Sequence, residues 1–443
     1  MKKNSGTLHI ISLGCPKNQI DSEVMGGLAR RAGMTLIDRP DDADTIIINT
    51  CSFIRSATEE SLEVILTLAE AKKKTRSGQK LVVAGCLAQR YGRELTHDIP
   101  EADLVIGTSE VGNIVRHLMS NKRGSVITKP DFLMNAAHDR LLPAGSATAY
   151  LKISEGCSNH CSYCVIPSLR GEARSRRPQD ICREAENLVA RGIREIILVG
   201  QDTAAYGRDL KTRPGLPDLI SGLDSISKLR WIRILYTHPA HLSADIVEAM
   251  ARHKKVCPYI DLPVQHIDDT ILASMRRRVT ADGIKSVIEL VRRIMPDAAL
   301  RTSLIVGFPG ESQNRFARLV DFVRETRFDH LGVFTYSPEE GTPAAAKPSR
   351  ISQREKERRR DLIMGEQAAI SYELNRGLIG SAQEVLIEAN SENKDYPFIG
   401  RTRRQAPEID GVTHVKGTDT KPGRFVRTKI TGADHYDLYA EIV

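Results

Sequence analysis

The sequence predicts an α/β fold in three parts: an N-terminal open parallel sheet, a central partial barrel of parallel strands, and a small C-terminal β-barrel. Short β-branched runs alternate with helical patterns in the first third of the chain, and a second series of such units follows. The last segment holds only short strands and turns. At 443 residues the chain is too long for one ordinary core, so several domains are expected.

The N-terminal part contains three short, apolar runs of the kind that parallel sheets bury, at Leu8–Leu13, Thr45–Asn49 and Leu81–Ala84. Between them, Ser56 and Glu59 form a capping box that predicts a helix from Ser56 to Ala71. The segment from 123 to 147 lacks periodicity, which predicts a linker.

The central part repeats the strand–helix alternation. Its candidate strands are Tyr150–Ile153, Glu195–Val199, Trp231–Leu235, Tyr259–Leu262, Ala299–Val306 and His330–Phe334. Repeated units with right-handed crossovers imply a barrel or part of one. A charged helix at Ser352–Asn375 leads into the last segment, where runs at 382–388, 412–415 and 426–430 predict a small β-barrel. We therefore expect domains at 1–125, 145–375 and 376–443.

Composition and charge fit a globular protein, with 41% hydrophobic residues and a formal net charge of +8. This charge permits a nucleic-acid or ribosomal partner without requiring one. The apolar run that begins at Leu8 is too short for a secretory signal and His9 interrupts it. No stretch approaches the roughly 20 apolar residues of a membrane helix. We expect a cytoplasmic protein, in which clustered cysteines indicate metal binding or catalysis.

Cys157, Cys161 and Cys164 form a C-x3-C-x2-C motif directly after the first strand of the central part. One interpretation is a zinc site, with His160 as the fourth ligand. The other is a [4Fe–4S] cluster that binds three thiolates and leaves one iron open to a small molecule. We favour the cluster, because three thiolates on one loop suit it and the flanking residues agree.

Cys15, Cys51 and Cys86 each follow one of the three N-terminal strands. In an open parallel sheet the crevice lies beyond the carboxyl ends of the strands, so these distant thiols can converge there. Gly14 and Gly85 allow the tight backbone that such an approach needs. A single cysteine is usually a small buried residue, but the shared position favours a site. The remaining pair, Cys182 and Cys257, we assign to packing.

Residues 155–167, with Arg170-Gly171 and Arg174-Ser175-Arg176, resemble the signature of radical S-adenosylmethionine enzymes, specifically the methylthiotransferases. Residues 14–18 and 49–53 are similar to the N-terminal domain of that family. The resemblance covers essentially the whole chain. It implies a partial TIM barrel, two [4Fe–4S] clusters on the two cysteine triads, S-adenosylmethionine as cofactor, and a C-terminal TRAM domain.

The resemblance also implies contacts to the cofactor. Tyr163 precedes the third cysteine of the loop, where the superfamily packs an aromatic residue near the adenine. Four further residues follow barrel strands, where barrel active sites collect: Gln201, Gln265, His266 and Gly307. The implied chemistry is methylation of a sulfur held by the N-terminal cluster, followed by transfer of the methylthio group to a substrate radical.

Two substrates compete within the family. One is a transfer-RNA adenosine carrying an isopentenyl or threonylcarbamoyl group, and the other is the β-carbon of an aspartate in ribosomal small-subunit protein twelve. The tRNA enzymes typically read Gly-Cys-Gln-Met-Asn and Pro-Val-Gln-Ser-Gly, whereas this chain has Gly-Cys-Pro-Lys-Asn and Pro-Val-Gln-His. We therefore expect the ribosomal protein as partner, free or in the 30S subunit, together with an electron donor protein. Gln19 and Arg177 depart from the common pattern but are not predicted ligands.

The C-terminal domain is basic and in relatives of this type grips RNA, so contact with ribosomal RNA is expected. Its basic residues are Arg401, Arg403, Arg404, Lys416, Lys421, Arg424, Arg427 and Lys429. Such charges are also common on a merely solvated face. An alternative from another class is an RNA-binding factor with structural or redox-sensing clusters. Three-ligand sites argue against it, because a structural site is usually closed.

Overall fold

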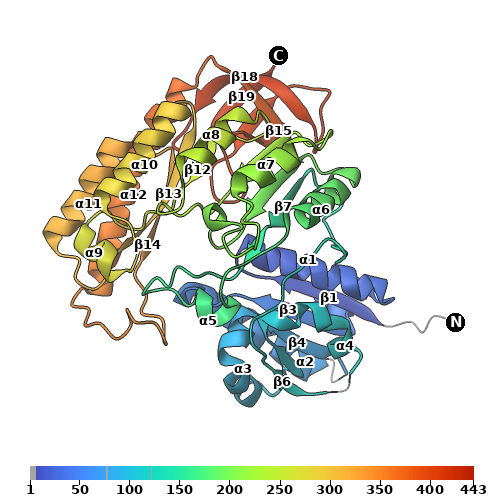
Figure 1. Cartoon of the computed structure of the whole chain (residues 1–443). Helices are drawn as coiled ribbons and strands as arrows, with labels where there is room; N and C mark the ends of the chain where they lie inside the picture. The colour runs from blue at the N-terminus through green and yellow to red at the C-terminus, as the bar shows by residue number, and fades with distance from the viewer. Residues whose placement is uncertain (1–5, 76–77, 121) are drawn as a thin grey trace. The chain divides into compact units, whose positions relative to one another are not determined.

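The computed structural model describes residues 6–75, 78–120 and 122–443 (Figure 1). The chain packs into two compact units. The first comprises Met1–Leu142, Lys152–Glu184 and Glu339–Thr342, and the second comprises Pro143–Leu151, Ala185–Pro338 and Pro343–Val443. The loop with Cys157, Cys161 and Cys164 therefore belongs to the same unit as the N-terminal sheet.

The first unit is built on a six-stranded parallel sheet in the order β2-β1-β3-β4-β5-β6. Its strands are β1 (Thr7–Ser12), β2 (Thr35–Leu36), β3 (Thr45–Thr50), β4 (Lys80–Gly85), β5 (Leu104–Ile106) and β6 (Gly124–Val126). The three predicted strands are β1, β3 and β4, which lie side by side. The additional strands have only two or three residues each, too few to show a period.

Helices of the first unit are α1 (Pro16–Arg31), α2 (Arg55–Thr75), α3 (Cys86–Asp98), α4 (Ile114–Leu118) and α5 (Ile166–Arg170), and a short hairpin pairs β8 (Ser154–Glu155) with β9 (Arg174–Ser175). Two expectations were wrong in detail. The predicted linker begins with a strand, because β6 completes the sheet beside β5. Helix α2 starts at Arg55, so Ser56 lies inside its first turn and does not cap it.

The core of the first unit lies against the central strands of the sheet. All six residues of β3 are buried, and Ile46 and Ile48 pack with Ile65 of α2 and Leu87 of α3. Strands β1, β3 and β4 pair in parallel, in registers that run to the pairs Ser12–Asn49 and Thr50–Gly85. The carboxyl ends of β1, β3 and β4 therefore meet at one edge of the sheet.

In the second unit, six strands follow one another in two three-stranded sheets, β11-β10-β7 and β12-β13-β14, joined by a bridge between Ile232 and Val256. The strands are β7 (Thr148–Lys152), β10 (Glu195–Val199), β11 (Trp231–Ile234), β12 (Tyr259–Asp261), β13 (Ala299–Val306) and β14 (His330–Thr335). All six predicted strands are confirmed to within two residues at each end.

The helices that connect these strands are α6 (Pro178–Ala190), α7 (Leu216–Asp224), α8 (Ala244–Arg252), α9 (Asp269–Ser274), α10 (Ala281–Ile294) and α11 (Gln313–Thr326), and α12 (Gln353–Gly377) follows the last strand. The Ser352 hydroxyl caps α12 by accepting a hydrogen bond from the Glu355 amide. No helix in the described ranges is long and apolar enough to cross a membrane.

The C-terminal segment forms a closed five-stranded barrel in the order β15-β16-β17-β19-β18. Its strands are β15 (Ala382–Asn390), β16 (Phe398–Thr402), β17 (Thr413–Lys416), β18 (Phe425–Ala433) and β19 (Leu438–Ile442). The small β-barrel is confirmed, although β16 and β19 lie outside the predicted runs. Val385, Ile387 and Val415 form its buried core.

The basic face predicted for this barrel is smaller than expected. Arg401 is fully buried and pairs with Glu195 of β10 and Glu388 of β15. Arg403 donates to the Lys254 carbonyl, and Arg404 pairs with Asp329. These three arginines serve packing inside the second unit. The other five basic residues are exposed: Lys416, Lys421, Arg424, Arg427 and Lys429.

Candidate cluster-binding site

The three N-terminal cysteines meet at one edge of the first unit's sheet. Cys15 follows β1 and precedes α1, Cys51 directly follows β3, and Cys86 is the first residue of α3 after β4. A Cβ atom placed on Gly14 would lie only 2.9 Å from the Cys51 sulfur. The structure therefore confirms that these three strand ends converge, as predicted.

Glycine is required next to two of these cysteines. Gly14 and Gly85 have φ values of +89° and +96°, in the left-handed region that favours glycine. A Cβ on Gly85 would also lie 2.6 Å from the Thr50 carbonyl oxygen. The absence of a side chain allows the β4–α3 turn to pass close to the end of β3, which brings Cys86 toward Cys51.

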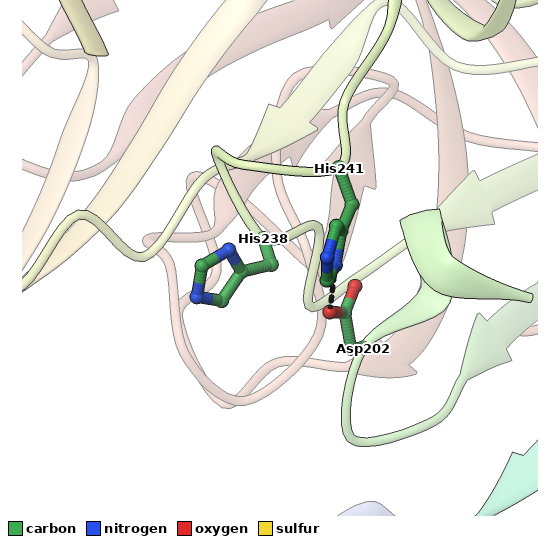
Figure 2. Close-up of side chains that lie close together, drawn as sticks. All are labelled: Asp202, His238 and His241. Carbon is green, nitrogen blue, oxygen red and sulfur yellow. Dashed lines mark hydrogen bonds and ion pairs between the residues drawn. The ribbon is translucent and has the colours of Figure 1, made fainter. Parts of the chain in front are cut away.

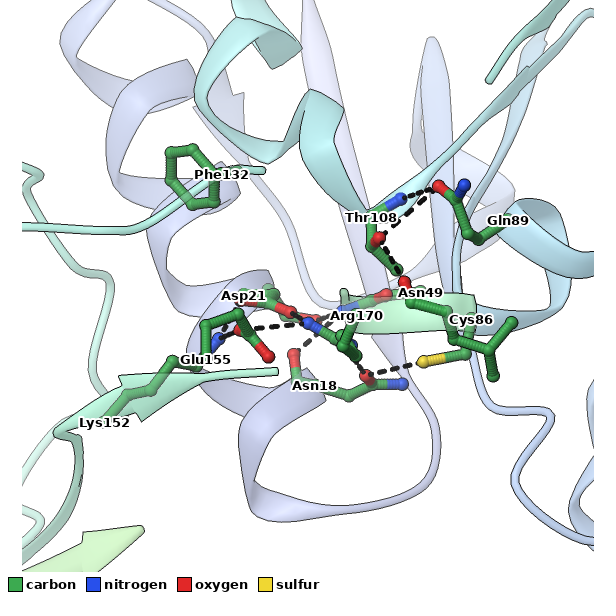
Figure 3. Close-up of polar contacts among 12 residues, drawn as sticks. Asn18, Asp21, Asn49, Cys86, Gln89, Thr108, Phe132, Lys152, Glu155 and Arg170 are labelled. Carbon is green, nitrogen blue, oxygen red and sulfur yellow. Dashed lines mark hydrogen bonds and ion pairs between the residues drawn. The ribbon is translucent and has the colours of Figure 1, made fainter. Parts of the chain in front are cut away.

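Asn18 joins two of the strand ends that carry cysteines. Its side-chain nitrogen Nδ2 donates to the Leu13 carbonyl at 3.0 Å and to the Thr50 carbonyl at 2.8 Å. Its side-chain oxygen lies 3.8 Å from the Cys86 sulfur; Figure 3 draws this contact as a dashed line. Asn49 in turn donates to the Asn18 carbonyl at 2.8 Å. One asparagine thus contacts the residues that precede two cysteines and the thiol of the third.

Arg170, at the end of α5, projects into a buried group of charges beside these thiols (Figure 3). Its guanidinium donates to Asp21 at 2.6 Å, lies 3.3 Å from Glu155, and contacts the Asn18 side-chain oxygen. Lys152 pairs with the same two carboxylates, at 2.5 Å and 2.7 Å. Two cations and two anions balance each other, which buried charges require.

The thiol pKa values reflect this setting. Burial, followed by the nearby Cys86 and Cys15, raises the pKa of Cys51 to about 12. Burial also raises the pKa of Cys86, against the opposing charge of Arg170. Burial would raise the pKa of Cys15, but Lys17, Arg170 and backbone N–H groups outweigh it and lower that pKa. Arg170 therefore favours the thiolate, the form that binds metal, at all three cysteines.

The central cysteines lie on a loop of the first unit between β8 and α5. Gly156 has a φ of +77°, and the Cys157 amide donates to the Gly171 carbonyl at 3.0 Å, which closes the base of the loop. The Cys164 amide donates to the Cys161 carbonyl at 3.1 Å. His160 is about half exposed, and its Nε2 lies 3.4 Å from Glu172.

The spacing of the thiols bears on the zinc interpretation. Ligand atoms that bind one zinc ion at about 2.3 Å can lie at most about 4.6 Å apart. Among the described residues, the group whose ligating atoms all lie within 4.8 Å of one another is Asp202, His238 and His241, and it includes no cysteine. Neither cysteine triad forms such a group among the described residues, so this spacing gives no support to a zinc site. A [4Fe–4S] cluster binds its three thiolates through three different irons and does not require the sulfur atoms to lie that close.

The other predicted cofactor contacts divide between the units. Tyr163 is half-buried in the first unit, and Gln201, Gln265, His266 and Gly307 lie in the second. Gln201, Gln265 and Gly307 follow β10, β12 and β13, as expected. Gln265 adopts a φ of +69°, unusual for a non-glycine residue, and its carbonyl accepts from the Ile305 amide at 2.8 Å.

His266 is fully buried, and burial lowers its pKa to about 4. Its Nδ1 accepts a hydrogen bond from the Asp268 amide at 3.0 Å. Gly307 has a structural reason to be glycine, because a Cβ there would collide with the Lys356 side chain of α12. Cys257 is buried beside Arg233, and Cys182 is half-buried on α6.

Three residues that hold the N-terminal site were not predicted as site residues: Asn18, Lys152 and Arg170. Asn18 and Arg170 stand inside the motifs that carry the family resemblance. Their position in those motifs was the available signal. In the sequence, Lys152 is an ordinary residue at the end of a strand. Its partner Asp21 is 131 positions away, so no local pattern indicates that the two residues pair.

Three family models match successive parts of the chain. Residues 7–107 match the uncharacterized protein family UPF0004, residues 151–323 match the radical SAM superfamily, and residues 379–443 match the TRAM domain. The first two matches contain the two cysteine triads.

Curated relatives are similar over the whole length. The ribosomal protein uS12 methylthiotransferase RimO of Syntrophus aciditrophicus is 55% identical, over 99% of this chain and 98% of the relative. The chain belongs to the RimO family of radical SAM methylthiotransferases. The RimO of Citrifermentans bemidjiense is 44% identical over 100% of this chain and 99% of its own length. The cofactors of this enzyme class are [4Fe–4S] clusters and S-adenosylmethionine.

A solved structure shares the fold. The radical S-adenosylmethionine methyltransferase TsrM from Kitasatospora setae aligns with a TM-score of 0.55 at 12% identity, covering 87% of this chain and 79% of that protein. At this identity the likeness concerns the fold alone. It supports the predicted α/β class, with a parallel N-terminal sheet and a radical SAM domain, for a RimO family member.

Proposed function

We propose that this protein adds a methylthio group to the β-carbon of an aspartate in ribosomal protein uS12. The observation that carries the proposal is the 55% identity to a uS12 methylthiotransferase over 99% of the chain. The Gly-Cys-Pro-Lys-Asn and Pro-Val-Gln-His motifs, which differ from those of the tRNA enzymes, support the same substrate.

We propose that Cys15, Cys51 and Cys86 hold an auxiliary [4Fe–4S] cluster, and that Cys157, Cys161 and Cys164 hold the radical SAM cluster. Tyr163, Gln201, Gln265, His266 and Gly307 are the proposed contacts to S-adenosylmethionine, in domains bounded at 1–125, 145–375 and 376–443. When bound, these groups supply a carbon radical from S-adenosylmethionine and an iron that can carry sulfur.

The protein's own residues prepare the N-terminal site in three ways. Asn18 and Gly85 fix the strand ends, so the three thiols are delivered to one place. Arg170 supplies positive charge that compensates thiolates in a buried setting. Asp21, Glu155 and Lys152 hold that guanidinium in one orientation. Three cysteines per site would leave one iron of each proposed cluster without a cysteine ligand.

The exposed basic residues of the C-terminal barrel support contact with ribosomal RNA. Lys416, Lys421, Arg424, Arg427 and Lys429 are all exposed on β17, β18 and the loop between them. Contacts to phosphate of this kind are weak and salt-dependent. An external electron donor protein completes the proposed set of partners. Because ribosomal proteins are the proposed substrates, we place the enzyme in the cytoplasm.

Mass spectrometry of uS12 and of bulk tRNA tests this function. A bacterium that lacks its own RimO gene is complemented with this chain or with a Cys157→Ala variant. We expect a methylthio mass increase on uS12 only with the unaltered chain, and no change in tRNA. The Cys257→Ala variant is the matched control, because Cys257 is a buried cysteine outside both triads.

Two results would redirect the proposal. Methylthio groups that appear on tRNA and not on uS12 would identify the transfer-RNA activity. Unmodified uS12 and tRNA, with RNA binding intact, would favour the non-catalytic RNA-binding factor. Formation of 5′-deoxyadenosine from S-adenosylmethionine and a reductant separates that factor from an enzyme.

A further inference from the structure

The second unit carries a cluster of polar side chains that has no part in either cysteine triad (Figure 2). Asp202 follows β10, and His238 and His241 follow β11, the neighbouring parallel strand. All three therefore lie at the carboxyl ends of barrel strands, where barrel active sites are built. Asp202 Oδ2 and His241 Nδ1 are 2.6 Å apart, so these two residues satisfy each other.

His238 is oriented differently. Its side chain is buried, and its Nδ1 accepts a hydrogen bond from the Ala240 amide at 3.1 Å. Because that nitrogen is an acceptor, the proton of the neutral ring lies on Nε2. This Nε2 is buried and makes no hydrogen bond within the described part of the chain. A buried donor without an acceptor is costly, which points to a partner that the protein alone does not supply.

The charges around His238 indicate the nature of that partner. Burial, followed by the positive charge of Arg277, lowers the pKa of His238 to about 3; the Asp202 carboxylate opposes this shift, and Arg208 acts in the same direction as Arg277. The ring is therefore a neutral donor. His241 lines an open pocket of about 690 Å³ whose charged side chains are Arg208, Arg213, Asp218 and Asp245. His238 itself is a neutral donor on which Arg277 and Arg208 act, and such a donor is suited to a carboxylate.

A divalent cation is the competing ligand, because the three residues offer ligating atoms within 4.8 Å of one another. Two observations weigh against it. The nitrogen of His238 that an amide N–H already occupies is not available to a metal, and Figure 2 shows the ring turned away from Asp202 and His241. Neighbouring arginines also repel a cation.

We propose that His238 donates a hydrogen bond from Nε2 to the carboxylate of an acidic side chain on the protein substrate, at a site in which Arg208 and Arg277 favour the anion. This inference rests on the proposed function and deepens it. The Asp202–His241 pair is a positioning element that holds the loop after β11 beside the end of β10. The site makes the enzyme prefer an aspartate over its neutral amide.

Equilibrium binding of two fluorescent peptides to the reconstituted holoenzyme tests the inference. One peptide spans the modified aspartate of uS12, and the other has asparagine at that position. A hydrogen bond to a charged group corresponds to roughly a 10- to 100-fold preference. We expect the unaltered protein to prefer the aspartate peptide to that extent, and His238→Ala to lose the preference by weakening the aspartate peptide alone.

His238→Gln, which keeps a donor, should restore part of the preference, and His253→Gln is the matched control. His253 is bonded to Asp224 and Ser221 away from this site, so its variant should bind as the unaltered protein does. Iron content and thermal midpoint identify any variant that has not folded. In turnover, the defect of His238→Ala should appear chiefly as a raised KM for the aspartate peptide.

If His238→Ala still prefers the aspartate peptide to the asparagine peptide, the inference is overturned, while the proposed function stands. Loss of S-adenosylmethionine affinity in His238→Ala, with peptide binding unchanged, would overturn it by assigning the carboxylate to the cofactor. Stoichiometric Zn²⁺ binding that His238→Ala and Asp202→Asn both abolish would overturn it in favour of a cation. If the unaltered protein binds neither peptide but modifies tRNA, the proposed function fails, and the inference with it.

Discussion

Two buried arginine clusters of similar chemistry occupy different places in the molecule. In the first unit, Arg170 pairs with Asp21 and Glu155 beside Cys86 and two further thiols. In the second, Arg233 and Arg401 pair with Glu195, and Arg233 lies beside the lone Cys257. A buried arginine next to a cysteine is thus no sign of function by itself. Three thiols delivered by three strands distinguish the first cluster.

The largest effect expected from this comparison comes from removing one arginine of each cluster. Arg170→Met and Arg401→Met should each cost about 3–5 kcal/mol of stability, because each leaves carboxylates buried without a partner. Only Arg170→Met should also lower the iron bound by the N-terminal cysteines. Denaturant unfolding of the apoprotein and iron analysis after reconstitution measure the two effects.

Arg170→Lys is the matched control, since it keeps the positive charge without the planar, bidentate hydrogen-bonding geometry of the guanidinium. It should retain more iron than Arg170→Met. Equal loss of iron in Arg170→Met and Arg401→Met would show that the two clusters do not differ in the way described.

Acid should weaken the second cluster in a defined range of pH. Burial alone would raise the pKa of Glu195, but Arg401 and Arg233 outweigh it and lower that pKa to about 2. The ordinary value is about 4.3, so the stabilisation is complete above that pH and is lost as pH falls toward 2. The contribution is on the order of 3 kcal/mol.

The free energy of unfolding, measured from about pH 6 to about pH 3, tests this effect. The unaltered protein should lose stability more steeply than Glu195→Gln, which has no carboxyl to protonate. Parallel curves for the two proteins would contradict the assignment of a low pKa to Glu195.

The smallest effect contrasts a buried arginine of the C-terminal barrel with an exposed one. Arg427→Ala should weaken binding to a ribosomal RNA fragment and reduce the salt dependence by roughly 0.7 to 1 in the logarithmic slope. Arg401 is buried in its ion pair, so Arg401→Ala should affect stability and leave that slope unchanged. Fluorescence anisotropy over a range of salt concentrations gives both slopes. Unchanged binding in Arg427→Ala would show that this face is only solvated.

Much of the fold could be predicted from the sequence, because its long strands carry a strong local signal. All six barrel strands and the three cysteine-bearing strands show apolar, β-branched runs. Strands such as β2 and β5 have only two or three residues, and their pairing depends on adjacent strands that a local sequence pattern cannot identify. The capping box at Ser56 was misleading, because the helix begins one residue earlier.

The candidate site was predictable where position along the chain determines position in space. A cysteine at the end of each of three adjacent parallel strands must lie at one edge of the sheet. The contacts of Arg170 and Lys152 with Asp21 join residues far apart in sequence, and only the folded chain brings them together. The same limit explains why Arg401 was expected on the surface. Its partner Glu195 is 206 residues away.

The central claim is that six cysteines in two triads hold two [4Fe–4S] clusters, while Cys257 holds none. Iron and sulfide analysis after anaerobic reconstitution tests it most directly, in the unaltered protein and in Cys51→Ala, Cys161→Ala and Cys257→Ala. We expect about 8 iron atoms per chain in the unaltered protein and in Cys257→Ala, and about 4 in each of the other two variants. Undiminished iron in Cys51→Ala or Cys161→Ala, or one zinc ion in place of a cluster, would contradict the claim.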